Sequence, residues 1–344
     1  MRVTTLHGPR DVRLEERPEP TIEQPTDAVI EVTASCICGS DLWSYRGENP
    51  IEPGQTIGHE VIGVVREVGP EVRSFKPGDF VLVPFCHCDN TCAHCRDGMT
   101  SACVNVGVTK GGQGDFARVT QAEGSLVRVD SGPDPALAPA LLALTDVMAT
   151  GWHAAKTSGV RPGGTAVVVG DGAVGLCGVL AAHQLGAERV VAMSRHEPRQ
   201  RIAEKFGATD IVAERGEDGI ARVLDLTDGV GADTVLECVG TASAVETAFA
   251  VARPGSTVGF VGIPHGVEVP VRQMFSRNVG LAGGMAPVRT YLPELLDLVL
   301  TGAIDPSPVF DLQLPLSEVA EGYGAMDERR AIKVLLDPRA GQAS

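Results

Sequence analysis

The apolar and polar positions follow two different patterns along the chain. Over about the first 130 residues, short runs rich in Val and Ile, at 28–33, 59–68 and 79–83, are separated by turn sequences such as Lys76-Pro77-Gly78-Asp79. Short strands between frequent turns are typical of a barrel-like β domain. The residues from about 136 to 156 predict a helical stretch after it.

Beyond Gly164, strand-like runs alternate with Ala-rich segments of helical length. We expect strands at 165–169, 189–192, 210–212, 233–237, 256–261 and about 278–282, with helices that include 174–185 and 199–206. Repeated β–α units predict a doubly wound parallel sheet with helices on both faces. A helix at about 292–300 and a last strand at 331–336 are expected near the end of the chain.

The first strand of this α/β region leads directly into a glycine-rich turn, Gly170-Asp171-Gly172-Ala173-Val174-Gly175. In a G-x-G-x-x-G turn the first glycine allows the tight turn, the second lets a pyrophosphate approach the backbone, and the third lets the helix pack close to the strand. The helix N-terminus then offers N–H groups to the anion. The pattern predicts a dinucleotide site, and the alternative is a glycine-rich turn without a ligand.

The end of the next strand bears on which dinucleotide binds. An NAD site carries Asp or Glu there to accept hydrogen bonds from the ribose, but this chain has Ala192-Met193-Ser194-Arg195-His196, with no acid before Glu197. Ser194 and Arg195 suit a 2′-phosphate, and Arg199 adds positive charge. We therefore expect NADP rather than NAD, the alternative being an arginine that faces water.

Charge and length narrow the class of protein. The chain has 344 residues, enough for two or three domains, and a net charge of −15 with a pI of about 5.0. An acidic surface disfavours binding to nucleic acid or anionic lipid. No apolar run approaches the ~20 residues of a membrane helix, and the N-terminus lacks a signal-peptide pattern, so we expect a cytoplasmic protein.

Five of the nine cysteines lie between residues 86 and 103. Cys92, Cys95 and Cys103, with Asp89 before them, have the spacing of a closed tetrahedral zinc site in one loop. Cys86 and Cys88 compete with Asp89 for the first ligand position. The alternatives are a reduced cluster without metal, and a disulfide between Cys92 and Cys95.

A second set of possible ligands is dispersed along the chain. Cys38 follows a strand, His59 opens another, and Asp146 lies in the helical region. One Cys, one His and one carboxylate leave a coordination position of zinc open for water or substrate. Each residue also has an ordinary alternative, because Cys38 is suited to a core, His59 to a strand end and Asp146 to a helix cap.

Taken together, these motifs resemble the zinc-dependent medium-chain alcohol dehydrogenases over nearly the whole chain. The resemblance rests on Cys38-Gly39-Ser40-Asp41, Gly58-His59-Glu60, the cysteine cluster, the segment 146–153 and the glycine-rich turn. It implies an α/β protein with a GroES-like β-barrel catalytic domain, formed by 1–149 and completed by 287–344, and a Rossmann domain at 150–286. It implies hydride transfer between an alcohol, or its aldehyde or ketone, and a nicotinamide cofactor, in a homodimer or homotetramer.

The resemblance also assigns roles to single residues. Cys38, His59 and Asp146 would hold the catalytic zinc, with Glu60 as neighbour or alternating fourth ligand, and Ser40 would take the alcohol proton. Further residues align with the substrate cavity (Phe85), the nicotinamide contact (Val261, Gly262 and Ile263) and the cofactor diphosphate (Lys333).

Two positions depart from the family pattern. Asp89 stands where the structural zinc site usually begins with cysteine, so either Asp89 or Cys88 completes the site. Trp43 stands where the family often has the histidine that passes the proton to solvent, which leaves the end of the relay open; Trp43 would instead narrow the substrate pocket.

Two other functions compete with this interpretation. A zinc-free reductase of the same superfamily, acting on activated double bonds, is disfavoured because Cys38, His59 and Asp146 are all present. A non-catalytic NADPH-binding thiol sensor would use the cysteine cluster, but a sensor has no use for an open zinc site.

Overall fold

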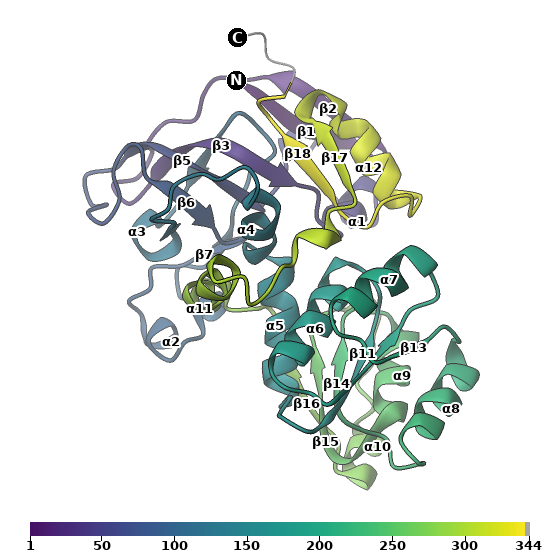
Figure 1. Cartoon of the computed structure of the whole chain (residues 1–344). Coiled ribbons are helices and arrows are strands. Elements are labelled where there is room, and N and C mark those ends of the chain that lie inside the picture. The colour runs from purple at the N-terminus through teal and green to yellow at the C-terminus, as the bar shows by residue number, and fades with distance from the viewer. Residues whose placement is uncertain (341–344) are drawn as a thin grey trace. The chain divides into compact units, whose positions relative to one another are not determined.

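The computed structural model describes residues 1–340, which form two compact units (Figure 1). One unit is discontinuous and consists of Met1–Asp146 and the segment from Pro287 onward, and the other is the continuous segment Val147–Ala286. The first boundary follows Asp146, slightly before the position expected from the sequence.

The discontinuous unit is built around a seven-stranded sheet. Its strands run in the order β10-β6-β5-β3-β18-β17, and β9 also pairs with β3. The bounds are β3 Ala28–Cys36, β5 Val61–Val68, β6 Phe80–Val83, β9 Phe116–Val119, β10 Val127–Arg128, β17 Leu312–Pro315 and β18 Val334–Asp337. Since β18 pairs with β3, the purple and yellow ends of the chain meet in one sheet (Figure 1).

Shorter elements complete this unit. A three-stranded sheet has the order β2-β1-β4, and β7 pairs with β8; the strands are β1 Arg2–Gly8, β2 Asp11–Glu16, β4 Gln55–Thr56, β7 Cys86–His87 and β8 Gly107–Val108. The helical segments are α1 Asp41–Tyr45, α2 Ala93–Arg96, η1 Thr100–Ala102, α3 Ala122–Ser125, α4 Ala138–Leu144, α11 Val288–Leu300, η2 Ser307–Val309, η3 Leu316–Glu318 and α12 Val319–Asp327.

The segment expected to be helical from about 136 to 156 is helical, but it forms two helices and not one continuous helix. It is divided into α4 and α5 (Val147–Ser158), and Thr145 and Asp146 lie between them. The Thr145 hydroxyl donates to the Leu142 carbonyl at 2.7 Å, while the Thr145 carbonyl accepts from Phe85 N at 3.0 Å. A side chain that bonds its own backbone in this way competes with helix continuation, and the break leaves Asp146 at the edge of the discontinuous unit.

The continuous unit is an α/β fold with a parallel six-stranded sheet, in the order β13-β12-β11-β14-β15-β16. The strands are β11 Thr165–Val169, β12 Arg189–Met193, β13 Asp210–Val212, β14 Ala232–Glu237, β15 Ala252–Phe260 and β16 Gly280–Gly283. The helices are α5, α6 Ala173–Gln184, α7 Glu197–Lys205, α8 Gly216–Leu226, α9 Ala242–Val251 and α10 Val271–Arg277. Helices α5 and α6 lie on one side of the sheet, and α8 and α9 lie on the other (Figure 1), so the parallel sheet predicted from the β–α alternation is confirmed.

Buried Val and Ala side chains fill the space between this sheet and its helices. Val167, Val191 and Val235, on three adjacent strands, are fully buried, as is Phe249 of α9. Within residues 1–340, no helix combines the length and apolar character needed to cross a bilayer.

Candidate functional site

Four side chains with metal-ligating atoms meet in the discontinuous unit. Cys38 follows β3, His59 and Glu60 directly precede β5, and Asp146 lies between α4 and α5. One ligand atom from each of the four lies within 4.8 Å of the others. The structure thus brings together the dispersed residues that the sequence suggested as a zinc site.

Asp41 orients this group from α1, a role that the sequence analysis did not assign. Its Oδ1 lies 3.5 Å from His59 Nδ1, so that His59 Nε2 faces Asp146 Oδ2, also at 3.5 Å. Asp41 Oδ2 accepts from Cys38 N at 3.0 Å and from Gln113 Nε2 at 3.3 Å. A carboxylate that holds the far nitrogen of an imidazole fixes the tautomer of a histidine ligand.

The electrostatics of the four residues fit a divalent cation. Burial, together with the charges of Asp146 and Glu60, raises the pKa of Cys38 to about 11. Glu60 Oε1 lies 2.6 Å from Lys333 Nζ, while the buried Oε2 has no hydrogen-bond partner among the described residues. A buried thiol, two carboxylates and an oriented imidazole form the donor set that zinc takes, and a cation stabilises the thiolate.

Lys333 has contacts that the sequence analysis did not predict. Its side chain is only 1% exposed, and the ammonium donates to Glu60 Oε1 and to the Ile37 carbonyl; the contact with a cofactor diphosphate that the resemblance implies stays a prediction. Asp311 Oδ1 accepts from both Ile332 N and Lys333 N, so β18 begins only at Val334 and not at residue 331. In this structure Lys333 is the counterion of Glu60.

Two side chains beside the ligand group have properties that suit a substrate site. Ser40 is half-buried, its backbone N lies 3.5 Å from Cys38 Sγ, and its hydroxyl makes no hydrogen bond within residues 1–340. The Phe85 ring lies edge-on to His59, with 6.2 Å between ring centroids. Ser40 thus offers a hydroxyl without a partner in the described residues, and Phe85 offers an apolar surface beside His59.

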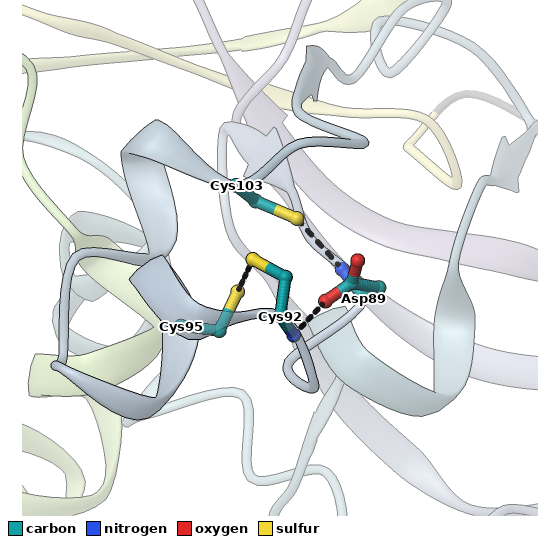
Figure 2. A group of neighbouring side chains, drawn as sticks. All are labelled: Asp89, Cys92, Cys95 and Cys103. Carbon is teal, nitrogen blue, oxygen red and sulfur yellow. Dashed lines mark hydrogen bonds between the residues drawn. The ribbon is translucent and has the colours of Figure 1, made fainter.

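A second ligand group lies in the loop around α2, where Asp89, Cys92, Cys95 and Cys103 point toward one another (Figure 2). One ligand atom from each of the four lies within 4.8 Å of the others. Cys92 Sγ is 3.6 Å from Cys95 Sγ, and Cys103 Sγ accepts from Asp89 N at 3.3 Å. The two-residue and seven-residue gaps therefore close into one cluster, as the spacing predicted.

Asp89 and Cys88 have different surroundings. Asp89 Oδ1 accepts from the amides of Thr91 (2.7 Å) and Cys92 (3.0 Å), and these bonds hold the pKa of Asp89 well below its usual range. Cys88 is 1% exposed and its thiol donates to the Gly124 carbonyl at 3.5 Å. Cys88 is outside the group of four, although its side chain packs against Cys95 and Cys103.

The glycine-rich turn of the continuous unit has the geometry of a pyrophosphate site. Gly170 has φ +117°, and a Cβ at Gly175 would lie 2.0 Å from the Gly170 carbonyl oxygen, so neither position accepts a side chain. A Cβ at Gly172 would meet no atom within 4 Å. The space over the turn is open at the N-terminus of α6, where backbone N–H groups bind anions, and the turn therefore fits a dinucleotide.

The residues expected to select the cofactor lie beside this turn. Arg195 is exposed and makes no hydrogen bond or ion pair with the described part of the chain. Ser194 is 1% exposed and Arg199 is half-buried, and both side chains donate to Asp171 of the turn. The sequence analysis gave no role to this acid, because the direction of its side chain is not readable from the motif.

The segment expected to meet the nicotinamide follows β15. Val261 N and Gly262 N donate to the Glu237 carbonyl at 2.9 and 3.3 Å, and Ile263 is 52% exposed. A Cβ at Gly262 would lie 2.1 Å from Gly240 N. The backbone of 261–263 is thus held against the neighbouring strand end, with the Ile263 side chain outward.

Comparison with known proteins gives consistent matches to both units. The profile of the alcohol dehydrogenase GroES-like domain matches residues 24–131, and that of the zinc-binding dehydrogenase matches residues 173–301. The "Probable zinc-binding alcohol dehydrogenase" of Mycobacterium tuberculosis is 36% identical over 338 residues, which cover 96% of this chain and 86% of that protein. The GroES-like assignment of the discontinuous unit is therefore confirmed.

Solved structures agree over the same length. Alcohol dehydrogenase TADH from Thermus sp. ATN1 has a TM-score of 0.91 and 31% identity, over 98% of this chain and 99% of that one. A Sinorhizobium meliloti protein described as a zinc-binding dehydrogenase, solved bound to NADP, has a TM-score of 0.81 and 26% identity, over 98% of this chain and 99% of that one.

Proposed function

Because the chain belongs to the zinc-binding medium-chain alcohol dehydrogenase family, we propose that it transfers hydride between an alcohol and NADP at the group formed by Cys38, His59, Glu60 and Asp146. The observation that carries this proposal is the convergence of these four residues within 4.8 Å. Bound zinc supplies a Lewis acid that lowers the pKa of a neighbouring hydroxyl, and the nicotinamide takes up the hydride.

The surrounding residues have separate tasks in this scheme. Cys38, His59 and Asp146 would hold the ion, and Asp41 at His59 Nδ1 keeps the imidazole in the tautomer that leaves Nε2 available for it. Glu60 stays close as a fourth carboxylate, and Lys333 balances its charge. Ser40, whose hydroxyl has no other partner in the described residues, would accept the proton of the substrate hydroxyl while its own proton passes to a ribose hydroxyl of the nicotinamide cofactor. Phe85 beside His59 keeps water from this side of the group.

The preference for NADP rests on positive charge beside the glycine-rich turn. Arg195 is exposed and unpaired within residues 1–340, and Arg199 lies nearby in the first turn of α7. A charge-assisted hydrogen bond contributes about 1.5–3 kcal/mol, so one bond from Arg195 to a 2′-phosphate supports a preference of about tenfold or more. The NADP bound by the Sinorhizobium meliloti protein supports the same choice.

In the loop around α2, we propose a structural zinc held by Asp89, Cys92, Cys95 and Cys103. The chemistry supports it, since carboxylate oxygen binds zinc at about 2.0–2.2 Å and thiolate at about 2.3 Å, and either fits a group of this size. The ion would stabilise the loop without taking part in the reaction.

The proposal is tested by measuring metal content and activity in the same preparation. Purified protein is analysed for zinc, and primary alcohols, secondary alcohols, polyols and the matching carbonyls are screened with both cofactors by the absorbance of the reduced nicotinamide. We expect zinc at both sites and turnover that disappears when the ion near Cys38 is removed by a chelator and returns with added zinc. Full turnover without zinc would contradict the proposal and favour a zinc-free reductase.

A further inference from the structure

Asp171, the second residue of the glycine-rich turn, has a carboxylate directed at the residues beside the cofactor site. Its Oδ2 accepts from Ser194 Oγ at 2.9 Å, and its Oδ1 accepts from Arg199 Nη1 at 3.2 Å. The same Nη1 reaches the Asp171 main-chain carbonyl at 3.2 Å. The Asp171 and Arg199 side chains are only 10% and 15% exposed, so the three groups form an ordered, nearly buried cluster.

The cluster lies where an NAD site would carry its acid. Strand β12 ends at Met193 with no Asp or Glu, and Ser194 is the next residue. The carboxylate of Asp171 lies within hydrogen-bond distance of that residue, although it comes from the turn after β11 and not from β12. The structure therefore places an acid next to the end of β12, although the sequence at the end of β12 contains none.

The hydrogen bonds of Asp171 also change what Ser194 and Arg199 offer to a ligand. Both groups suit a 2′-phosphate by their chemistry, yet both already donate to Asp171. Arg195 alone remains exposed without a partner in residues 1–340. The net charge of the Asp171, Arg195 and Arg199 side chains is one positive unit where the two arginines alone would give two.

We propose that Asp171 determines cofactor specificity, as a carboxylate that limits the preference for NADP and keeps NAD usable. This inference rests on the dinucleotide site of the proposed function. A carboxylate repels a phosphate dianion and competes with it for Ser194 and Arg199, whereas it accepts hydrogen bonds from the free ribose hydroxyls of NAD. Removing the charge while keeping the shape raises selectivity for NADP.

The experiment measures equilibrium binding without substrate. Dissociation constants of NADP and NAD are determined by calorimetric titration for the unmutated protein, Asp171→Asn and Asp171→Ser, and melting temperatures report whether each variant is folded. In both variants we expect NADP to bind at least about tenfold more tightly, because tenfold lies between the effect of one unit charge at about 4 Å in bulk water and its effect near a protein surface. NAD should bind equally or more weakly, so that the ratio of the two constants changes by at least about tenfold.

Asp233 provides the matched control. It is also an acid of the continuous unit, with Oδ1 3.0 Å from Arg253 and 3.6 Å from Arg161 and a 22% exposed side chain. It lies near the start of β14, while Asp171 follows the end of the neighbouring parallel strand β11, so the two acids are at opposite ends of the parallel strands. Asp233→Asn should lower stability without changing the ratio of the two dissociation constants.

Unchanged ratios in folded Asp171→Asn and Asp171→Ser would overturn the inference and leave Asp171 as a structural ion pair. An equal change of ratio in Asp233→Asn would overturn it as well. The outcome is independent of the preceding proposal: if the unmutated protein binds NAD more tightly, the NADP preference is wrong, yet a shift toward NADP in both Asp171 variants still supports the role of Asp171. Absence of turnover with any alcohol would contradict the dehydrogenase site without affecting these binding constants.

Discussion

Replacing Asp89 by Ala removes the only oxygen ligand proposed for the loop around α2. The Asp89 carboxylate accepts hydrogen bonds from Thr91 N at 2.7 Å, from Cys92 N at 3.0 Å and from Asn105 Nδ2 at 2.9 Å. A bond to a charged acceptor contributes about 1.5–3 kcal/mol when buried, but this site is largely solvated, so we assign about 0.5–1 kcal/mol to each. The three bonds together then contribute about 1.5–3 kcal/mol, before any contribution from the ion.

The assay combines zinc content with thermal unfolding. A loss of about 1.5–3 kcal/mol lowers the melting temperature by roughly 3–12 °C in a unit of this size, and Asp89→Ala should also lose one zinc ion per chain. Cys88→Ser is the matched control, because Cys88 is the rival ligand and its thiol donates to the Gly124 carbonyl; it should retain both ions. The reasoning is refuted if Asp89→Ala keeps both ions while Cys88→Ser loses one.

Three further predictions concern turnover and cofactor binding. Cys38→Ala should lower kcat/KM at least about a thousandfold through loss of the catalytic zinc, while NADP binding measured by fluorescence titration stays within a few-fold; a large loss of NADP affinity would contradict the separation of the two sites. Arg195→Ala should weaken NADP about tenfold, the loss of one charge-assisted bond, and leave NAD unchanged in the same titration, and equal effects on both cofactors would argue against a 2′-phosphate contact. Asp41→Asn should reduce kcat/KM or zinc affinity by about 10–100-fold, as for other groups that orient a histidine ligand. If metal affinity and rate are both unchanged, the 3.5 Å contact between Asp41 and His59 does not orient the ligand.

The fold was largely predictable because its patterns are local. The buried strand β11 begins and ends at the predicted residues, since a run of Val bounded by glycine is unambiguous. The break between α4 and α5 was not predicted, because Thr145 and Asp146 carry no strong helix-breaking signal and the Phe85 amide that binds the Thr145 carbonyl is distant in sequence.

The candidate metal ligands could be proposed from the sequence, but the residues that contact and orient those ligands could not. Cys38, His59 and Asp146 each have an ordinary alternative, and it is the resemblance to a family pattern that groups them as zinc ligands before their positions are known. The partners of these groups depend on tertiary contacts, as with Lys333, which meets Glu60 across 273 positions of the chain. The direction of the Asp171 side chain is likewise set by φ and ψ of the turn, which the motif Gly-Asp-Gly does not specify.

The discontinuous unit has a consequence for the order in which the protein folds during synthesis. One of its apolar cores joins Leu6 and Ile37 to Leu316, Tyr323 and Val334, and its main sheet contains β18 beside β3. The continuous unit is complete once Ala286 has been made, and units generally fold from the N-terminus as they emerge from the ribosome. Here the order is reversed, because the inserted α/β unit can fold first. The strands made earlier complete their sheet only after the C-terminal segment with β17 and β18 has been synthesised. A nascent chain stalled before β17 would therefore expose β3 and the buried Glu60 without its counterion, which makes this stage the one most exposed to aggregation and to quality-control proteases.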